Sequence, residues 1–464
     1  MALYEINAAS KYDDPTFGTK ESESLLPKKV MPQQENDPSV IRELVKDELF
    51  LDGNARQNLA TFCQTYVCDD VRDLMNLSIN KNLIDKDEYP QTAELERRCV
   101  NIVANLWNAP KTGNPVGTSG IGSSEACMLG GMAMLRRWKN ARKAKGLSTD
   151  KPNLVCGPVQ VVWDKFCRYW EVEMRQVPME TDRFYMDGPS MLSQIDENTI
   201  GVVATFGLTF TGKYAPVQEL CTALDQLQKE KGLDIQVHVD AASGGFCAPF
   251  CQPDLLWDFR LDRVKSISAS GHKFGLAPLG AGWVVWRDKS YLPEELIFNV
   301  NYLGGNMPVF QINFSRPAGQ IISQYYLFTR LGFEGYKKIQ SACYETAQFL
   351  SNGLDKMGYF DFIYRGDPKE GIPALTWTFK KGVDLGFSLY DLADKLRSRG
   401  WLVPAYSLPA NAESIVVQRI IVKQGFGLDM ASLLLQDFAR AIDELKEHHP
   451  VKALGADHGG FNHN

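Results

Sequence analysis

The sequence predicts an α/β fold with a mostly parallel central sheet. The apolar runs 199–205 and 235–239 have the length of buried strands, and residues 217–231 between them show helical periodicity. A strand, a crossover helix and a second strand in this order are typical of parallel neighbours with a right-handed connection. A third apolar run, 264–267, indicates a further strand.

The remaining elements follow in chain order. Ser39 is expected to cap a helix over residues 40–49, and residues 54–110 alternate helical stretches with polar turns. A glycine-rich segment, 117–125, opens a helix that continues to residue 135. A strand region is expected over 154–156 and 159–163, with Gln160 inside it. Later segments predict strands at 280–286, 376–379 and 415–422 and helices at 321–349 and 389–397.

Length and charge limit the class of protein. At 464 residues the chain exceeds what one hydrophobic core normally supports. We therefore expect an N-terminal arm and helix (1–57), a large domain (58–347) and a small α+β domain with a C-terminal tail (348–464). A net charge of −6 gives no basic surface for nucleic acid or anionic membranes, so an enzyme acting on small molecules is expected.

The ten cysteines lack the paired spacing of a zinc site or a disulfide framework, so no metal is expected. No apolar stretch approaches the ~20 residues of a membrane helix, and the N-terminus lacks the pattern of a signal peptide. We expect a cytoplasmic protein without an integral membrane segment.

Two of the expected strands end in small residues that include one key ionisable group each. Asp240 follows the run 235–239, and Lys273 closes the sequence Ser-Gly-His-Lys after the run 264–267. Ligands of open α/β sheets bind beyond the carboxyl ends of the strands. A neutral lysine amine there can capture an aldehyde cofactor as a Schiff base, while the carboxylate keeps a pyridinium nitrogen protonated. Taken alone, Asp240 could be a strand-end cap and His272 a structural loop residue; their order with Lys273 favours catalysis.

These two segments resemble the cofactor site of pyridoxal-phosphate (PLP) decarboxylases with the aspartate-aminotransferase-like fold, fold type I. The wider match is to the glutamate decarboxylases of the bacterial and plant-type branch. It extends over about residues 47–422 and the last few residues, and its motifs include 53–62, 78–90, 120–126 and 314–317. The resemblance implies decarboxylation of L-glutamate to 4-aminobutanoate (GABA) and CO2 with uptake of a proton, a reaction suited to acid resistance.

Two alternatives to that activity remain. One is another PLP-dependent reaction, either decarboxylation of a different amino acid or transamination. Gln160 and the region of Thr61 and Asp85 argue against aromatic substrates. The other is a non-catalytic scaffold with the same fold, which would be expected to lack Lys273, Asp240 or Arg419.

The glycine-rich helix start offers free backbone N–H groups to a phosphate, with Ser123 and Ser124 as the expected contacts. Ser270 and His272 lie beside Lys273 in sequence and can donate to the same phosphate. Three further roles are implied only by the resemblance: Gln160 stacks on the cofactor ring, Thr209 bonds its phenolic oxygen, and Ala242 packs on its face. Ser315 is implied to reach the phosphate of a neighbouring subunit, which makes a homodimer the minimal unit and leaves a hexamer open.

The resemblance also implies a substrate site. Thr61, Phe62 through its backbone, Asn82 and Asp85 hold the distal carboxylate of the substrate, and Asp85 shares a proton with it, which favours an acidic working pH. Without the resemblance, Thr61 and Phe62 would be a helix-packing pair and Asp85 a solvated loop residue. Arg419 clamps the α-carboxylate and so orients the bond to be broken, because a planar guanidinium binds a carboxylate through two bonds.

The last residues, 459–464, resemble a regulatory tail. In bacterial members of the family a similar tail closes the active site at neutral pH, which makes His463 the candidate, since a histidine must be uncharged to do so. Plant relatives end instead in a basic, tryptophan-bearing helix that binds calmodulin. This chain has only Lys446 and Lys452 and no Trp after Leu445, so no calmodulin binding is expected.

Overall fold

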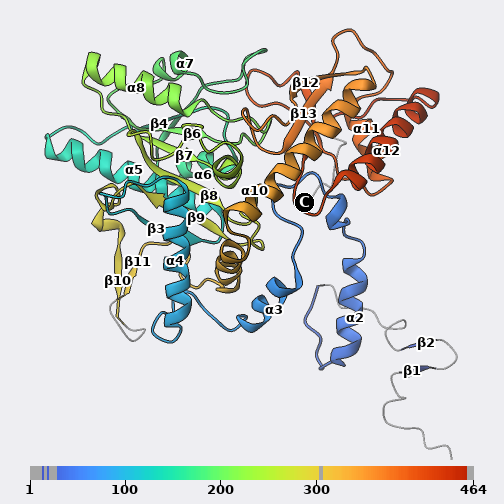
Figure 1. Cartoon of the computed structure of the whole chain (residues 1–464), viewed down its shortest axis with the longest axis horizontal. Coiled ribbons are helices and arrows are strands. Elements are labelled where there is room, and N and C mark those ends of the chain that lie inside the picture. The colour runs from blue at the N-terminus through green and yellow to red at the C-terminus, as the bar shows by residue number, and fades with distance from the viewer. Residues whose placement is uncertain (1–12, 15–17, 20–28, 302–306, 457–464) are drawn as a thin grey trace, which may run out of the picture. The chain divides into compact units, whose positions relative to one another are not determined.

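The computed structural model describes residues 13–14, 18–19, 29–301 and 307–456 (Figure 1). The chain divides into two compact units at Gln57 and Asn58. In the first unit, strand β1 (Asp13–Asp14) pairs antiparallel with β2 (Gly18–Thr19), and helix α2 covers Pro38–Leu49. The carboxylate of Asp37 caps this helix by accepting the N–H groups of Ser39 and Val40, at 2.8 and 3.4 Å. The expected cap at Ser39 is therefore wrong: proline fits the first helical position, which moves the cap to Asp37.

A seven-stranded sheet dominates the second unit and confirms the predicted fold class. Its order is β3-β9-β8-β7-β6-β4-β5. The bounds are β3 (Val116–Gly120), β4 (Asn153–Cys156), β5 (Glu173–Gln176), β6 (Thr199–Thr205), β7 (Val237–Asp240), β8 (Val264–Ser270) and β9 (Gly282–Trp286). Only β9 runs antiparallel to its neighbours. Every residue of β6 is buried, as expected of a strand covered on both faces.

Helices supply the layers around this sheet. They are α3 (Asp69–Leu77), α4 (Pro90–Leu106), α5 (Ser123–Ala144), α6 (Val161–Tyr169), α7 (Gly188–Leu192), α8 (Val217–Lys231) and α9 (Ala248–Cys251). A short hairpin, β10 (Phe298–Val300) with β11 (Met307–Val309), precedes the long helix α10 (Gly319–Lys356). Among the described residues, no helix is both long and apolar enough to cross a membrane. All ten cysteines lie in the described ranges, and all are free thiols.

Gln160 lies at a helix start, so its predicted place inside a strand is wrong. Strand β4 ends at Cys156, and α6 begins at Val161. The Gln160 side chain caps α6 by accepting the N–H of Val162 at 2.7 Å. The run Val159–Trp163 is rich in valine, and a short apolar run of this kind does not distinguish a strand from a buried helix.

The C-terminal part builds a second, smaller layer structure. The four-stranded antiparallel sheet β12 (Phe360–Tyr364), β13 (Ala374–Phe379), β15 (Val416–Ile421) and β14 (Ala405–Ser407) packs with α11 (Leu389–Arg397) and α12 (Leu428–Glu447). Its own apolar cluster is centred on residues such as Trp377 and Phe438. Figure 1 shows α10 extending from the large sheet to these orange and red segments. The boundary expected between residues 347 and 348 falls inside α10 and stays a prediction.

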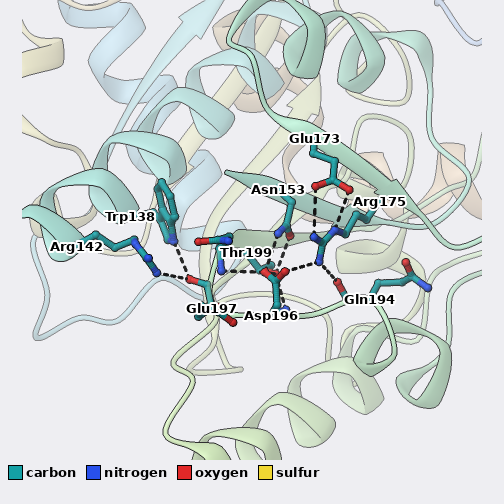
Figure 2. Close-up of polar contacts among 10 residues, drawn as sticks. Trp138, Arg142, Asn153, Glu173, Arg175, Gln194, Asp196, Glu197 and Thr199 are labelled. Atoms are coloured by element: carbon teal, nitrogen blue, oxygen red, sulfur yellow. Dashed lines mark hydrogen bonds and ion pairs between the residues drawn. The ribbon is translucent and has the colours of Figure 1, made fainter. Parts of the chain in front are cut away.

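Polar contacts fix the amino-terminal ends of β4 and β6 (Figure 2). The Asp196 carboxylate accepts from the Asn153 amide at 2.7 Å and pairs with Arg175 at 2.8 Å. Partial burial opposes ionisation of Asp196, but these donors and the N–H of Asn198 lower its pKa overall. This edge of the sheet is therefore held by a charged network, which leaves the opposite edge, at the carboxyl ends, free for a site.

Gly282 gives a test of the packing at that opposite edge. A Cβ added to Gly282 would collide with the backbone carbonyl of Gly122, which lies in the turn between β3 and α5. We expect Gly282→Ala to destabilise the protein by about 1–3 kcal/mol, because backbone cannot move aside as a flexible side chain can. The midpoint of thermal unfolding measures this. Gly113→Ala is the control, since its Cβ would meet no atom closer than 3.5 Å, and an equal loss in both variants would contradict the argument.

Candidate active site

A cavity of about 430 Å³ opens at the carboxyl ends of the central strands, beside the start of α5. It brings together all the predicted cofactor contacts except Ser315, namely Ser123, Ser124, Gln160, Thr209, Asp240, Ala242, Ser270, His272 and Lys273. The parallel register pairs Asp240, the last residue of β7, with Ser268 of β8. Asp240 therefore lies close to the point where the chain leaves β8 and continues to Lys273.

Lys273 borders the cavity and is half-buried. Its amine donates to the Ser243 hydroxyl at 3.3 Å and lies 4.9 Å from the centre of the Phe62 ring. Burial lowers the pKa of this amine, the charge of Asp240 opposes that shift, and the charge of Arg419 adds to it. The environment therefore favours the neutral, nucleophilic form of Lys273.

Asp240 is 3% exposed, and both of its oxygens are held. One accepts the indole N–H of Trp163 at 2.9 Å, and the other accepts the N–H of Ala242 at 3.1 Å. Two residues earlier in the same strand, the ring of His238 lies between the hydroxyls of Ser266 and Ser268, at 2.7 and 3.0 Å. Burial lowers the pKa of His238 to about 3, so this histidine is uncharged. Asp240 is thus fixed in direction with no imidazolium behind it.

The start of α5 forms a cradle for an anion. Gly122 precedes the helix, and a Cβ there would come within 3.1 Å of the His272 ring, so a side chain would narrow the space. The Ser270 hydroxyl donates to the Ser123 hydroxyl at 2.7 Å across this space. His272 accepts the N–H groups of Gly280 and Ala281 on Nδ1, at 3.3 and 3.1 Å.

His272 is a hydrogen-bond donor in this arrangement. Burial, and next the charge of Lys273, lower its pKa to about 4. A neutral ring that accepts on Nδ1 holds its proton on Nε2. Together with the N–H groups at the helix start, this donor suits a phosphate. An amine for an aldehyde, a carboxylate for a pyridinium nitrogen and a cradle for a phosphate are the groups that PLP requires.

Arg419, Phe62 and Thr61 gather beside the cavity. Arg419 is 7% exposed; it donates to the carbonyls of Thr209 and Ala60, the latter at 2.9 Å, and lies 4.4 Å from the centre of the Phe62 ring. Its buried Nε has no hydrogen-bond partner among the described residues. Burial lowers the pKa of Arg419. The guanidinium therefore has a donor left for a ligand.

Six predicted site residues are not among those that line the cavity, namely Thr61, Phe62, Asn82, Asp85, Ser315 and Arg419. Arg419 and Phe62 contact the lining residues Thr209 and Lys273. Asn82 donates to the Ser315 hydroxyl at 3.3 Å, and both border a separate cavity of about 300 Å³. Asp85 follows in the same turn, where its N–H donates to the Asn82 carbonyl at 3.2 Å. His463 lies outside the described residues.

Sequence reasoning missed three residues that shape the site. Trp163 positions Asp240, and Ser243 contacts Lys273. Glu125 accepts the N–H groups of Ile121 and Asn313, each at 2.9 Å, and so fixes the glycine-rich turn. Glu125 and Trp163 lie in the first turns of α5 and α6. This position at a helix start was the only feature of the sequence that could have pointed to a role in the site.

The model of the pyridoxal-dependent decarboxylase conserved domain matches residues 27–380. The chain belongs to this family. It is 57% identical to a glutamate decarboxylase of Aliivibrio fischeri over 100% of both chains, and 49% identical to a glutamate decarboxylase beta of Listeria innocua over 96% of both. The solved glutamate decarboxylase of Lactobacillus brevis is 45% identical, with a TM-score of 0.90 over 94% of this chain and 99% of that one.

A more distant solved structure supports the fold alone. The sphingosine-1-phosphate lyase of Burkholderia pseudomallei is 20% identical, with a TM-score of 0.76 over 92% of this chain and 95% of that one. The family match and the Lactobacillus brevis structure agree with the fit of the cavity to PLP, which is the cofactor of this chain.

Trp163→Phe tests whether the indole positions Asp240 for the cofactor. Losing a hydrogen bond to a charged group costs about 1.5 kcal/mol or more, so we expect roughly tenfold weaker PLP binding. The measurement is an absorbance titration of apoenzyme with PLP. Trp138→Phe is the matched control, because that indole bonds the Glu197 carbonyl on the far edge of the sheet. Unchanged affinity in Trp163→Phe would refute the role.

Proposed function

We propose that this chain decarboxylates L-glutamate to 4-aminobutanoate (GABA) and CO2, with PLP held at Lys273. The observation that carries the proposal is that Lys273 and Asp240 line one cavity, while Arg419, with an unfilled donor, contacts the lining residue Thr209 and the Phe62 ring that faces Lys273. The full-length similarity to proteins named glutamate decarboxylase supports glutamate as the substrate.

Asp240 and Lys273 would have different roles in the reaction. When bound, PLP joins amines through its aldehyde, and its protonated ring withdraws electrons from the bond that breaks at Cα. Asp240, held by Trp163, would accept the ring N–H and keep it protonated. Lys273 supplies the amine, and its lowered pKa keeps that amine available for attack.

Arg419 would orient the substrate. Its free Nε and the neighbouring nitrogens could bind the α-carboxylate in bidentate fashion, which would fix the direction of the bond between Cα and that carboxylate. This posture favours loss of CO2 over transamination. A proton then returns to Cα, so each turnover consumes one, which suits a role in acid resistance.

We further propose that the distal carboxylate lies at Thr61 and the backbone of Phe62. Asn82 and Asp85 would contribute to that subsite, and Ser315 would reach the phosphate of a neighbouring subunit. The position of these three residues outside the cavity of their own chain supports this arrangement, which requires a homodimer at minimum. We also propose that the chain is organised as an arm and helix, a large domain and a small domain, over residues 1–57, 58–347 and 348–464. The same proposal includes a cytoplasmic location and closure of the active site by His463.

Product analysis tests the reaction. The PLP-loaded protein should form GABA and CO2 from glutamate with a matching rise in pH, and should release CO2 more slowly from aspartate and aromatic amino acids. Lys273→Ala should abolish turnover, and borohydride should attach the cofactor to a peptide containing Lys273 in the unaltered protein. Turnover of glutamate by Lys273→Ala, or no GABA from fully loaded protein, would refute the proposal.

Arg419→Met tests the clamp on the α-carboxylate. A charged hydrogen-bond donor to a carboxylate contributes about 3 kcal/mol, so kcat/KM for glutamate should fall by roughly a hundredfold or more. Arg419→Lys should recover only part of this loss, because an ammonium cannot bind through a planar fork. PLP affinity serves as the control and should stay within a few-fold of the wild-type value. An Arg419→Met enzyme with unchanged kcat/KM would contradict the assignment.

A further inference from the structure

Lys423 is a buried cation that the roles assigned above do not use. It follows β15 and is 3% exposed. Its amine donates to the Thr61 hydroxyl at 3.3 Å and to the Cys63 carbonyl at 3.1 Å. Within the described part of the chain, no carboxylate forms an ion pair with it. Burial lowers its pKa to about 8, so it is charged at and below neutral pH. A buried charge without a counterion is costly. The Lys423 ammonium therefore favours the binding of an anion nearby.

The segment held by Lys423 borders the proposed substrate site. Lys423 contacts Thr61 and Cys63, the two neighbours of Phe62. The Phe62 ring in turn faces the amine of Lys273 and the guanidinium of Arg419, with 4.9 and 4.4 Å between each cation and the ring centre. Two cations, Lys423 and Arg419, therefore contact the three consecutive residues 61–63, next to the amine of Lys273. Such a cluster matches a substrate with two carboxylates better than one with a single carboxylate.

The contact with Lys423 also fixes what Thr61 can do. A hydroxyl has one proton to donate, and its oxygen accepts from other donors. Because an ammonium has donors only, the Thr61 oxygen is the acceptor of this bond, and the hydroxyl proton stays free for another partner. Thr61 is exposed, and its N–H donates to the Asn58 amide oxygen at 3.2 Å, which fixes the turn. The hydroxyl is thus prepared to donate to an incoming anion.

We propose that Lys423 is a positioning residue for the distal carboxylate of the substrate. Its ammonium donates to the Thr61 oxygen and so directs the hydroxyl proton toward that carboxylate. Its positive charge strengthens the hydrogen bond between the Thr61 hydroxyl and the carboxylate. Lys423 thereby sets the preference for amino acids with a second carboxylate. This inference rests on the proposed function, which places that carboxylate at Thr61.

A purely structural role would be an anchor for the segment 61–64. Gln424, which follows Lys423 in the sequence, provides a matched control that tests this anchoring role separately. Its amide oxygen accepts from the Gln64 amide at 2.9 Å, so it anchors the same segment without a charge. Removing Gln424 loosens the segment but leaves the ammonium on Thr61.

The experiment compares the PLP-loaded wild type with Lys423→Met, Lys423→Arg and Gln424→Leu. It measures kcat and KM for glutamate and the inhibition constants of glutarate and pentanoate, which differ in the second carboxylate. In Lys423→Met we expect KM for glutamate and the glutarate constant to rise about tenfold, the effect of one charged hydrogen bond, with kcat and pentanoate inhibition little changed. Lys423→Arg should restore most of the affinity, and Gln424→Leu should resemble the wild type.

Thr61 gives a second route if Lys423→Met does not fold. Thr61→Val should raise the inhibition constant of glutarate without affecting that of pentanoate, and Thr61→Ser should recover most of this loss because it keeps the hydroxyl. In the double variant Lys423→Met/Thr61→Val the two losses should not add, because both act through one bond.

The inference is overturned if Lys423→Met leaves the KM and the glutarate constant unchanged, if Gln424→Leu weakens them equally, or if pentanoate and glutarate weaken together. Failure of the proposed function has a different signature, because the wild type itself would then form no GABA from glutamate.

Discussion

The parallel pairing of β7 with β8 is the constraint on which the site depends. It brings Asp240 beside Ser268, so that the chain leaving β8 carries Lys273 to the same edge of the sheet. Asp240 at the end of β7 and Lys273 in the turn after β8 are thereby held at one edge of the sheet. Their separate contacts, Asp240 with Trp163 and Lys273 with Ser243, keep the space between them open for a cofactor.

Burial then determines the charge state of the site. The pKa values of Lys273, Arg419 and Lys423 are all lowered by burial, while the carboxylates that border the cavity, Asp240 and Glu125, are held by N–H groups. Desolvated cations without paired carboxylates raise the cost of the empty state and increase the affinity for anions. The site is thus organised for a phosphate and a dicarboxylate together, which is why the same burial that activates Lys273 also favours the proposed substrate.

The sequence was sufficient where a local pattern and a local structure coincide. Residues 199–205 and 217–231 form a strand and a helix with the predicted bounds, because the first is a continuous apolar run of strand length and the apolar residues of the second recur at helical spacing. Gln160 was misplaced because a short valine-rich run fits a strand and a buried helix equally well. Trp163 and Lys423 could not be predicted, since their partners lie 77 and 362 residues away and only the packed fold defines those contacts.

The two segments that carry Asn82 and Ser315 lie outside the cavity lining and are bonded to each other. The Asn82 amide oxygen accepts the N–H of Arg316 at 3.0 Å, and the N–H of Leu83 donates to the Arg316 carbonyl at 2.9 Å. The guanidinium of Arg316 is buried and donates to the carbonyl and hydroxyl of Ser119, at 2.9 and 2.7 Å, near the end of β3. That strand leads directly into the phosphate cradle of its own chain. A subunit that presents Ser315 to its partner would therefore do so from a support shared with its own cradle, so that the two sites of the proposed dimer would be mechanically connected through β3.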